Sequence, residues 1–323
     1  MVKTALVGAW HVHAGEYANR INRNPDSEIV AVWDDDPARG KEWAERLGVK
    51  FYADYDELLS SDIDAVVVTT ATNIHGDIME KAANAGKHIY TEKVLAITDE
   101  DAERIAAAVK KNKVHFTISF PHEKDPAMLY AKKLIDDGKL GRIVHAVYRN
   151  CHTGSIDNWL PPHFYSKEQC GGGAMMDLGA HPMYMLNWLL GRPVSVVSTF
   201  TQMSGRGVED NATSVIEYEN GTIGVSETGF MTWGDPRSLE VSGTDGYLIV
   251  QEGSGLKYHT RTSGGWIIAD VGRERQHPVD YFVASIVNGS ENELYGIDEA
   301  VRLTKLMSAA YRSADSGKKE MIL

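Results

Sequence analysis

The first third of the chain alternates short apolar runs with amphipathic stretches. The apolar runs are continuous and rich in β-branched residues, which is typical of strands buried on both faces. The expected strands are 4–8, 28–33, 49–52, 64–70, 88–91 and 114–120, and the expected helices are 14–24, 37–47, 74–85 and 99–112. This alternation predicts an α/β fold with a doubly wound parallel sheet of the Rossmann type over residues 1–121.

Beyond residue 121 the pattern changes, and strands follow one another in series. Asn220-Gly221 between two apolar runs is a hairpin signal. The expected strands are 143–150, 194–202, 212–218, 222–228, 237–243 and 247–252, and the expected helices are 126–137, 173–190, 278–288 and 298–316. We therefore expect a second α/β domain over residues 122–323 with a mainly antiparallel sheet, and its last helix is free to pack back on the first domain.

Composition narrows the class of protein. The 323 residues include 33 Lys and Arg against 45 Asp and Glu, a net charge of −12. Nucleic acids and anionic membranes select basic surfaces, so neither is an expected partner. No apolar run approaches the roughly 18 residues of a spanning helix, and the N-terminus lacks a signal-peptide pattern. Two cysteines are too few for a disulfide framework. A soluble cytoplasmic protein is expected.

A glycine ends the first strand directly before a helix, at the place where Rossmann folds hold a pyrophosphate. The fingerprint G-x-G-x-x-G is met here by Gly8-Ala9-Trp10-His11-Val12-His13, in which only Gly8 matches. The cofactor-binding candidates in this turn are Gly8, Trp10, His11 and Val12. The alternative is a plain strand-to-turn glycine, with His13 capping the following helix.

Acidic residues end the second strand. Asp34 lies 26 residues after Gly8, and Asp35 follows it. A carboxylate there accepts hydrogen bonds from ribose hydroxyls and repels a 2′-phosphate. We expect no arginine at this tip to pair with such a phosphate, so NAD is favoured over NADP. The alternative is a solvated acidic turn before Pro37.

Two later motifs carry a family resemblance. The segment 85–96, AGKHIYTEKVLA, and the segment 171–181, GGGAMMDLGAH, resemble motifs of the Gfo/Idh/MocA oxidoreductases. Smaller matches are His75 at the start of a helix, the segment 134–141, and the closing helix that ends at 314–318. The matches extend over nearly the whole chain.

The resemblance implies a Rossmann domain, a second domain with an open antiparallel sheet, a nicotinamide cofactor and a sugar, polyol or cyclitol substrate. It implies a homodimer or homotetramer. The implied catalytic residues are Lys93 and His181, and Asp177 would bind substrate. The cofactor-binding candidates it adds are Thr70, His75, Glu92 and Lys93 itself. Departures from the family pattern are Val94 after the lysine, Trp10 in the turn, and His122 with its neighbours before the helix that begins near residue 126.

These residue types suit alcohol oxidation, which removes a hydride from carbon and a proton from oxygen. Histidine exchanges protons near neutral pH, so His181 is the expected acid–base group. Lys93 would stabilise the developing alkoxide. Asp177 and His181 are four residues apart, which would place both side chains on one face of the predicted helix 173–190. Because a third ligand is missing at recognisable spacing, no metal site is expected there.

Further substrate-binding candidates are Trp159 and His163 in a loop, Tyr184 one turn after His181, and His122. The alternative for the aromatic residues is a packing role beneath a long loop. The leading hypothesis is an NAD-dependent dehydrogenase or reductase acting on a secondary hydroxyl or ketone of a carbohydrate or cyclitol. Two other hypotheses stay open: a redox-neutral NAD-assisted glycoside cleavage or epimerisation, and a non-catalytic nucleotide- or sugar-binding regulator.

Overall fold

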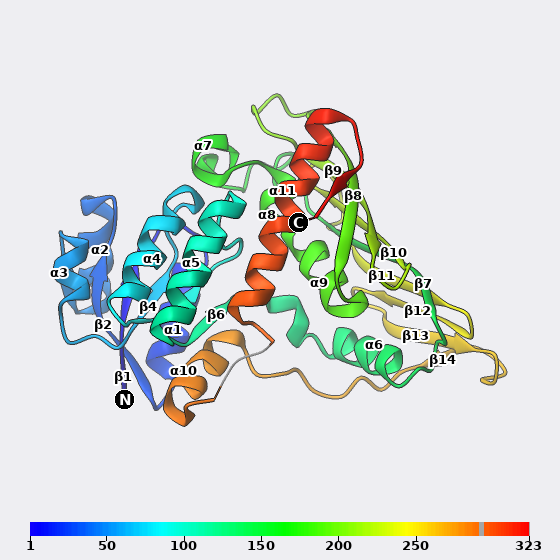
Figure 1. Ribbon diagram of the computed structural model, residues 1–323, viewed down its shortest axis with the longest axis horizontal. Coiled ribbons are helices and arrows are strands. Elements are labelled where there is room, and N and C mark those ends of the chain that lie inside the picture. The colour runs from blue at the N-terminus through cyan, green and yellow to red at the C-terminus, as the bar shows by residue number, and fades with distance from the viewer. Residues whose placement is uncertain (291–293, 323) are drawn as a thin grey trace. The chain divides into compact units, whose positions relative to one another are not determined.

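The computed structural model describes residues 1–290 and 294–322 of the chain, which divides into two units (Figure 1). Unit 1 contains Met1–Phe120 and Gln276–Thr304, and unit 2 contains Pro121–Arg275 and Lys305–Leu323. The segment 276–304 thus clusters with the first sheet, whereas sequence analysis assigned it to the second domain. The helix α11 (Ile297–Ser316) contributes residues to both units.

Unit 1 is built on a six-stranded sheet in which every pair of neighbours is parallel. The strand order is β3-β2-β1-β4-β5-β6, so the order reverses beside β1, as in a dinucleotide-binding Rossmann sheet. Its strands are β1 (Val2–Val7), β2 (Ser27–Trp33), β3 (Lys50–Tyr52), β4 (Ala65–Val68), β5 (His88–Thr91) and β6 (Phe116–Ile118). The predicted parallel sheet is confirmed.

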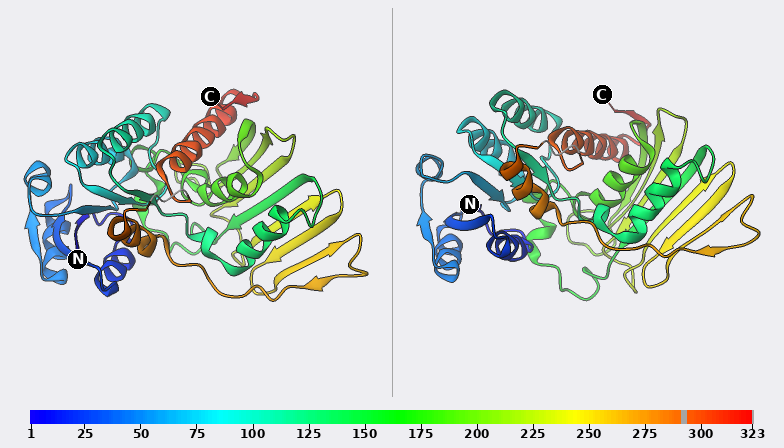
Figure 2. Two further views of the ribbon diagram at one scale, coloured as in Figure 1. Left: turned by 60° about the horizontal axis from the view of Figure 1, so that its bottom comes forward. Right: turned by 90° about the horizontal axis from the view of Figure 1, so that it is seen from below.

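Helices cover both faces of this sheet, as Figure 2 shows. They are α1 (Ala14–Arg23), α2 (Pro37–Leu47), α3 (Tyr55–Leu59), α4 (His75–Asn84), α5 (Asp99–Asn112) and α10 (Pro278–Asn288). The helices α4 and α5 pack against each other. On the other face a buried cluster joins the sheet to α1, α2 and α10, and it includes Tyr17, Val279 and Phe282. Burial of these side chains explains why α10 belongs to unit 1.

Local signals set the ends of these helices. Asp36 caps α2 by accepting hydrogen bonds from the backbone N–H groups of Ala38 and Arg39, and Pro37 takes the first turn. Gly48 ends α2 with φ of 70°, in the left-handed region that favours glycine. The predicted range 37–47 is therefore confirmed to the residue.

Unit 2 is built on a nine-stranded sheet in the order β14-β13-β12-β11-β7-β10-β9-β8-β15. Its strands are β7 (Ile143–Cys151), β8 (Pro193–Thr201), β9 (Asn211–Tyr218), β10 (Ile223–Gly229), β11 (Arg237–Gly243), β12 (Gly246–Gln251), β13 (Gly255–Thr260), β14 (Ile267–Ile268) and β15 (Glu320–Met321). Among the described residues of this sheet, β7 and β10 pair in parallel and the other neighbouring strands pair antiparallel, so the predicted mainly antiparallel sheet is confirmed.

The helices of unit 2 are α6 (Pro126–Asp136), α7 (Lys167–Cys170), α8 (Ala174–Asp177) and α9 (Ala180–Leu190). Three of them, α6, α8 and α9, contact strands of the sheet, and Figure 2 shows the arrangement of helices and sheet. The predicted single helix 173–190 is wrong, because α8 ends at Asp177 and α9 begins at Ala180. The amide of Gly179 still bonds to the carbonyl of Ala174, and that of His181 to Leu178, so the break is a local change in the hydrogen-bond pattern.

Among the helices of residues 1–290 and 294–322, none combines the length and apolar character needed to cross a bilayer.

One half-buried histidine of unit 1 makes the stability depend on pH. His88 at the start of β5 accepts a hydrogen bond from the His115 backbone N–H at its Nδ1 (3.0 Å), which requires a neutral Nδ1. Burial, with the nearby His115 ring, lowers the pKa of His88 to about 4 from its ordinary 6.5. The unfolded chain then binds this proton first, so stability falls as the pH drops from 6.5 towards 4.

We expect His88→Asn, which keeps an acceptor for the His115 amide, to reduce that loss by roughly 1 kcal/mol, since His88 is partly solvated. Urea unfolding at several pH values measures it. The exposed His259→Asn is the matched control and leaves the pH profile unchanged. An identical pH profile for wild type and His88→Asn would contradict the prediction.

Candidate functional site

The turn after β1 depends on Gly8. Its φ is 76°, and a Cβ at this position would overlap the Thr70 side chain and lie 2.8 Å from the Thr70 Cα. Gly8 and Thr70 therefore bring the carboxyl ends of β1 and β4 together, at the point where the strand order reverses. This is the edge at which open α/β sheets bind their ligands.

The side chain of Asp34 has a different place from the expected one. Its carboxylate is fully buried and accepts hydrogen bonds from the backbone N–H of Ala9 (2.8 Å) and of Asp36 (2.8 Å). It also makes two bonds to the Arg39 guanidinium, at 2.9 and 2.5 Å. The expectation that this tip lacks an arginine is wrong. Asp34 thus holds the turn together, while the Asp35 side chain is 43% exposed. Ribose binding by either residue stays a prediction.

The remaining cofactor-binding candidates of the turn differ in how far their side chains are buried. Trp10 is buried at 7% exposure, so its indole is part of the core, while Val12 is exposed at 54%. His13 does not cap α1 with its side chain, because its imidazole bonds to Glu92 (2.7 Å).

His75 at the start of α4 is fully buried and holds backbone in place. Its Nδ1 contacts the carbonyl oxygens of Val94 (3.1 Å) and Leu95 (3.2 Å), and its Nε2 contacts that of Thr70 (3.3 Å). Burial lowers the pKa of His75, which favours the neutral ring. The imidazole thus ties the segment after Lys93 to the end of β4. The peptide between Lys93 and Val94 is cis.

Glu92 is the centre of a buried polar cluster. One carboxylate oxygen, Oε1, accepts from the Tyr17 hydroxyl and contacts His13 Nδ1, while Oε2 accepts from the backbone N–H of Lys93 (2.8 Å). The Tyr17 hydroxyl also contacts Ser119 Oγ at 2.9 Å. Glu92 therefore fixes the backbone that carries Lys93, which is itself buried at 7% exposure.

The charges of this cluster are coupled. Burial alone would raise the pKa of the Glu92 carboxyl, but the imidazoles of His11 and His13 outweigh it and hold that pKa well below its usual range. Burial lowers the pKa of His13, yet the Glu92 charge outweighs this and leaves that pKa raised. Burial, with the same charge, raises the pKa of Tyr17 well above its ordinary value.

In unit 2 the histidine candidates come together. His181 at the start of α9 is buried at 8% exposure, and its ring stacks on that of His122 with centroids 4.2 Å apart and planes at 19°. The Tyr184 hydroxyl lies 3.0 Å from His181 Nδ1 and accepts the backbone N–H of His122 at 3.0 Å. The Tyr148 hydroxyl lies 3.0 Å from His122 Nδ1. Three of the predicted residues thus form one cluster.

The glycine triplet before α8 allows close packing. A Cβ at Gly172 would overlap the Tyr311 hydroxyl, and one at Gly173 would overlap the Glu209 carbonyl. Glu209 accepts from the backbone N–H of Gly173 (2.8 Å) and from Tyr311 (2.6 Å). Sequence analysis missed Glu209 and Tyr311, because their partners lie 36 and 102 residues away in the chain. Asp177 ends α8, half-buried.

The loop candidates Trp159 and His163 contact residues close to them in the chain. Trp159 is 53% exposed, and its indole donates to Thr153 Oγ1 (3.3 Å) and packs on His152. His163 is half-buried, and its carbonyl accepts from Cys170. The pattern agrees with anchoring within the loop and leaves substrate binding by either residue as a prediction.

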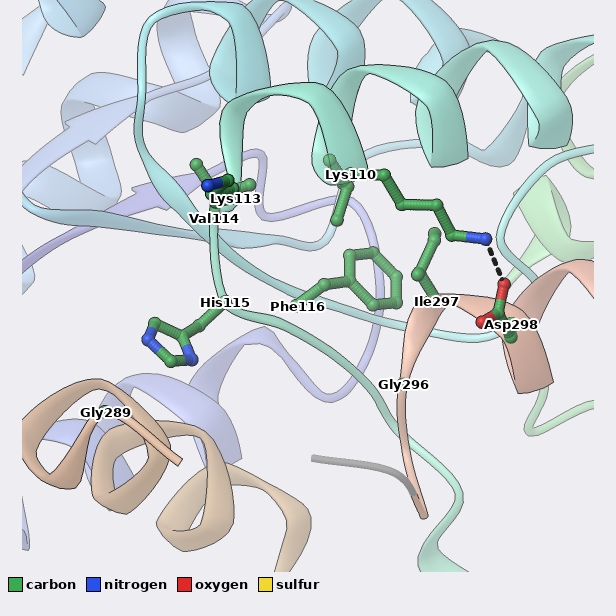
Figure 3. A pocket seen from close by; sticks show the side chains of 10 residues that line it. Lys110, Lys113, Val114, His115, Phe116, Gly289, Gly296, Ile297 and Asp298 are labelled. Carbon is green, nitrogen blue, oxygen red and sulfur yellow. Dashed lines mark hydrogen bonds and ion pairs between the residues drawn. The ribbon is translucent and has the colours of Figure 1, made fainter. Parts of the chain in front are cut away.

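A pocket of unit 1 at the start of α11 contains none of the predicted site residues (Figure 3). Its lining includes Lys113, His115 and Phe116, and the ammonium of Lys110 pairs with Asp298 at 2.5 Å across it. The candidate residues lie elsewhere, among them Gly8 after β1 and Lys93 after β5 in unit 1 and His181 at the start of α9 in unit 2.

The chain matches two family models. Residues 2–120 match the model described as oxidoreductase family, NAD-binding Rossmann fold, and residues 128–249 match the GFO/IDH/MocA C-terminal domain. The chain belongs to the GFO/IDH/MocA oxidoreductase family. The resemblance seen in the two sequence motifs is confirmed, and so is the predicted NAD-binding Rossmann domain.

Relatives of this GFO/IDH/MocA protein are named for cyclitol and sugar chemistry. Inositol 2-dehydrogenase of Rhizobium meliloti (strain 1021) is 29% identical, with 97% of this chain and 96% of the relative covered. The scyllo-inositol 2-dehydrogenase (NAD(+)) of Bacillus subtilis (strain 168) is 29% identical over 77% of this chain and 73% of the relative. The solved structure of GenD2 from gentamicin A biosynthesis in complex with NAD is 26% identical, with a TM-score of 0.85 over 100% of this chain and 96% of that one.

Proposed function

We propose that this family member transfers a hydride between NAD and a secondary hydroxyl or ketone of a sugar, polyol or cyclitol. His181 serves as the acid–base group and Lys93 stabilises the alkoxide. The observation that carries the proposal is the buried imidazole of His181, held by Tyr184 and stacked on His122. The relatives named as inositol dehydrogenases support the substrate class.

The Tyr184 hydroxyl suits a histidine that gains and loses a proton. Its oxygen accepts the His122 backbone N–H, and a phenol keeps one further lone pair and one proton for bonding. It can donate to an unprotonated His181 Nδ1 and accept from a protonated one, with no movement of the ring. His181 therefore has the same partner before and after it takes the proton of a hydroxyl.

The stacked ring of His122 disfavours protonation of both rings at once. Two positive charges about 4 Å apart repel each other by about 4 kcal/mol at an effective dielectric constant near 20. The pair at 4.2 Å therefore holds one proton more readily than two. One ring of the pair therefore stays unprotonated, which is the form that a base requires.

In unit 1 the backbone of Lys93 is fixed from two sides. Glu92 accepts its N–H, and His75 holds the carbonyl oxygens of the two residues that follow it. A lysine fixed in this way can hold its ammonium at a set place and stabilise an alkoxide without further ordering.

The residues of unit 1 fit a dinucleotide. The Gly8 turn runs into the N-terminus of α1, where the dipole favours a pyrophosphate, and Asp35 is exposed at the end of β2 for a ribose hydroxyl. When bound, NAD supplies the hydride acceptor or donor. The Asp35 carboxylate repels a 2′-phosphate, and the Arg39 guanidinium is already paired with Asp34 and Asp35, which supports a preference for NAD over NADP.

A substrate panel tests this function. Inositols, aldoses, polyols and sugar acids are incubated with the full-length chain and NAD or NADP, and the reduced cofactor is followed by its absorbance, with and without added cofactor. We expect net NADH formation from at least one cyclitol or sugar, and a higher kcat/KM with NAD than with NADP. Product formation without net NADH would support the redox-neutral alternative, and a lack of turnover with every compound would support a non-catalytic regulator.

We extend the proposal to a homodimer or homotetramer in the cytoplasm. Apolar side chains on the neighbouring strands β8, β9 and β10 of the unit 2 sheet are exposed on one face, among them Val197, Val215 and Ile223 at 44%. An apolar face of this kind supports association with a second copy.

A further inference from the structure

Two histidines of the cofactor turn are unusual for a phosphate-binding loop, and the proposed function does not use their imidazoles. His11 and His13 are separated by one residue, and Glu92 lies 79 residues further along the chain than His13. The possible ligand atoms of His11, His13 and Glu92 all lie within 4.8 Å of one another. Within residues 1–290 and 294–322, no other group of three or more histidine, cysteine or acidic side chains meets this criterion.

We propose that His11, His13 and Glu92 form a binding site for a divalent transition-metal ion of the zinc class. Two imidazoles and one carboxylate are the three protein ligands of many zinc sites that keep a fourth position open. The proposal goes beyond the hydride transfer described above and does not depend on it.

The distances are close to those of a coordination sphere. Glu92 Oε1 lies 2.7 Å from His13 Nδ1 and 3.8 Å from His11 Nδ1, and the two imidazole centroids are 4.8 Å apart. Ligand atoms about 2.1 Å from a tetrahedral zinc ion lie about 3.4 Å from one another. The observed separations fall on both sides of this value, and His11 Nδ1 accepts the backbone N–H of His13 at 3.3 Å, so binding of the ion requires both imidazoles to rotate.

The carboxylate is supported as a ligand. Glu92 is buried, and its oxygens accept hydrogen bonds from the Tyr17 hydroxyl and from the Lys93 backbone N–H. Ligand carboxylates in metal sites are commonly held by such outer partners, which orient them for the ion. The Ser119 hydroxyl in turn contacts the Tyr17 oxygen.

The donor atoms indicate which ions the site can bind, and the exposure of His13 indicates how an ion reaches it. Imidazole nitrogens suit zinc, cobalt, nickel and copper, whereas calcium and magnesium require several oxygen ligands. The imidazole of His13 is 40% exposed while Glu92 is at 3%, so an ion enters from the His13 side. The positive charge of Lys93 acts on Glu92 and disfavours a cation bound there. The carboxylate alone is therefore not expected to hold the ion, and binding depends on both imidazole nitrogens.

Titration of the EDTA-treated full-length chain with Co²⁺ and Zn²⁺ tests the site. We expect one equivalent per chain with a Kd of about 1 μM or tighter, and visible d–d absorption of the Co²⁺ form typical of nitrogen and oxygen ligands in a tetrahedral site. His11→Asn and His13→Asn each weaken binding at least about 100-fold, and Tyr17→Phe weakens it by about 10-fold through its hold on Glu92. His115→Asn, a histidine of unit 1 outside the group, binds as wild type.

Three outcomes would overturn the proposal: no stoichiometric binding in wild type, equal binding in His13→Asn, or equal loss in His115→Asn. Because His13 is partly exposed, His13→Asn is expected to fold, and circular dichroism of each variant identifies a loss caused by misfolding. The readout is metal content and absorption, so a failure of the proposed hydride transfer leaves this test unaffected.

Discussion

Replacing His181 by alanine lowers kcat by about 10²–10⁴-fold with the best substrate of the panel, the range for loss of an acid–base group. The His181 side chain is buried and held at one nitrogen by Tyr184. Alanine supplies no group that can exchange a proton at this position. Lys93→Ala lowers kcat by about 10²-fold, since the ammonium stabilises a charge that develops in the transition state. Steady-state rates with NAD measure both.

Two further variants make the His181 result specific. Tyr184→Phe keeps the ring in α9 but removes the hydroxyl, so we expect a smaller loss in kcat together with a changed pH profile of kcat/KM. His259→Ala, at an exposed position of β13, leaves both parameters unchanged. Wild-type rates in both His181→Ala and Lys93→Ala would sink the proposed roles, even if the protein proves to be a dehydrogenase.

Asp34→Ala destabilises unit 1 by about 3 kcal/mol, measured by urea unfolding at neutral pH. The change leaves the Arg39 guanidinium without its buried partner and removes the acceptor for the Ala9 and Asp36 amides. Breaking a buried ion pair from one side costs about 3–5 kcal/mol, and Arg39 is partly solvated, so the lower end applies.

The adjacent Asp35→Ala is the matched control for stability. Its carboxylate is 43% exposed and shares the same guanidinium, so we expect a loss below about 1 kcal/mol. A loss for Asp34→Ala no larger than for Asp35→Ala would contradict the role of Asp34 as a clamp.

Periodicity was sufficient for most of the fold. The strand at 88–91 and the helices at 37–47, 99–112 and 278–288 were predicted to the residue, because β-branched runs, Pro37 and flanking glycines are local signals. The short helix α3 and the strands β13 to β15 were missed. They are brief, and their pairing partners rather than their own sequence decide their conformation.

The site shows the same division between local and long-range information. The sequence identified His181, Tyr184 and His122 as candidates, but the stacking of two of them depends on residues 59 positions apart in the chain. Asp34 was predicted as a ribose ligand from its place after β2. Its burial against Arg39 and the Ala9 amide is a tertiary contact that a single strand end does not reveal.

The contribution of α10 to the core of unit 1 bears on how the chain folds during synthesis. Val279, Phe282 and Val283 cover side chains of β1 and α1, yet the ribosome makes them more than 150 residues after Phe120. A nascent or recombinant fragment that stops at the end of the family's nucleotide-binding segment would therefore leave one side of its sheet open to water. The hydrophobic core of unit 1 is complete only after the ribosome has synthesised the segment that contains α10.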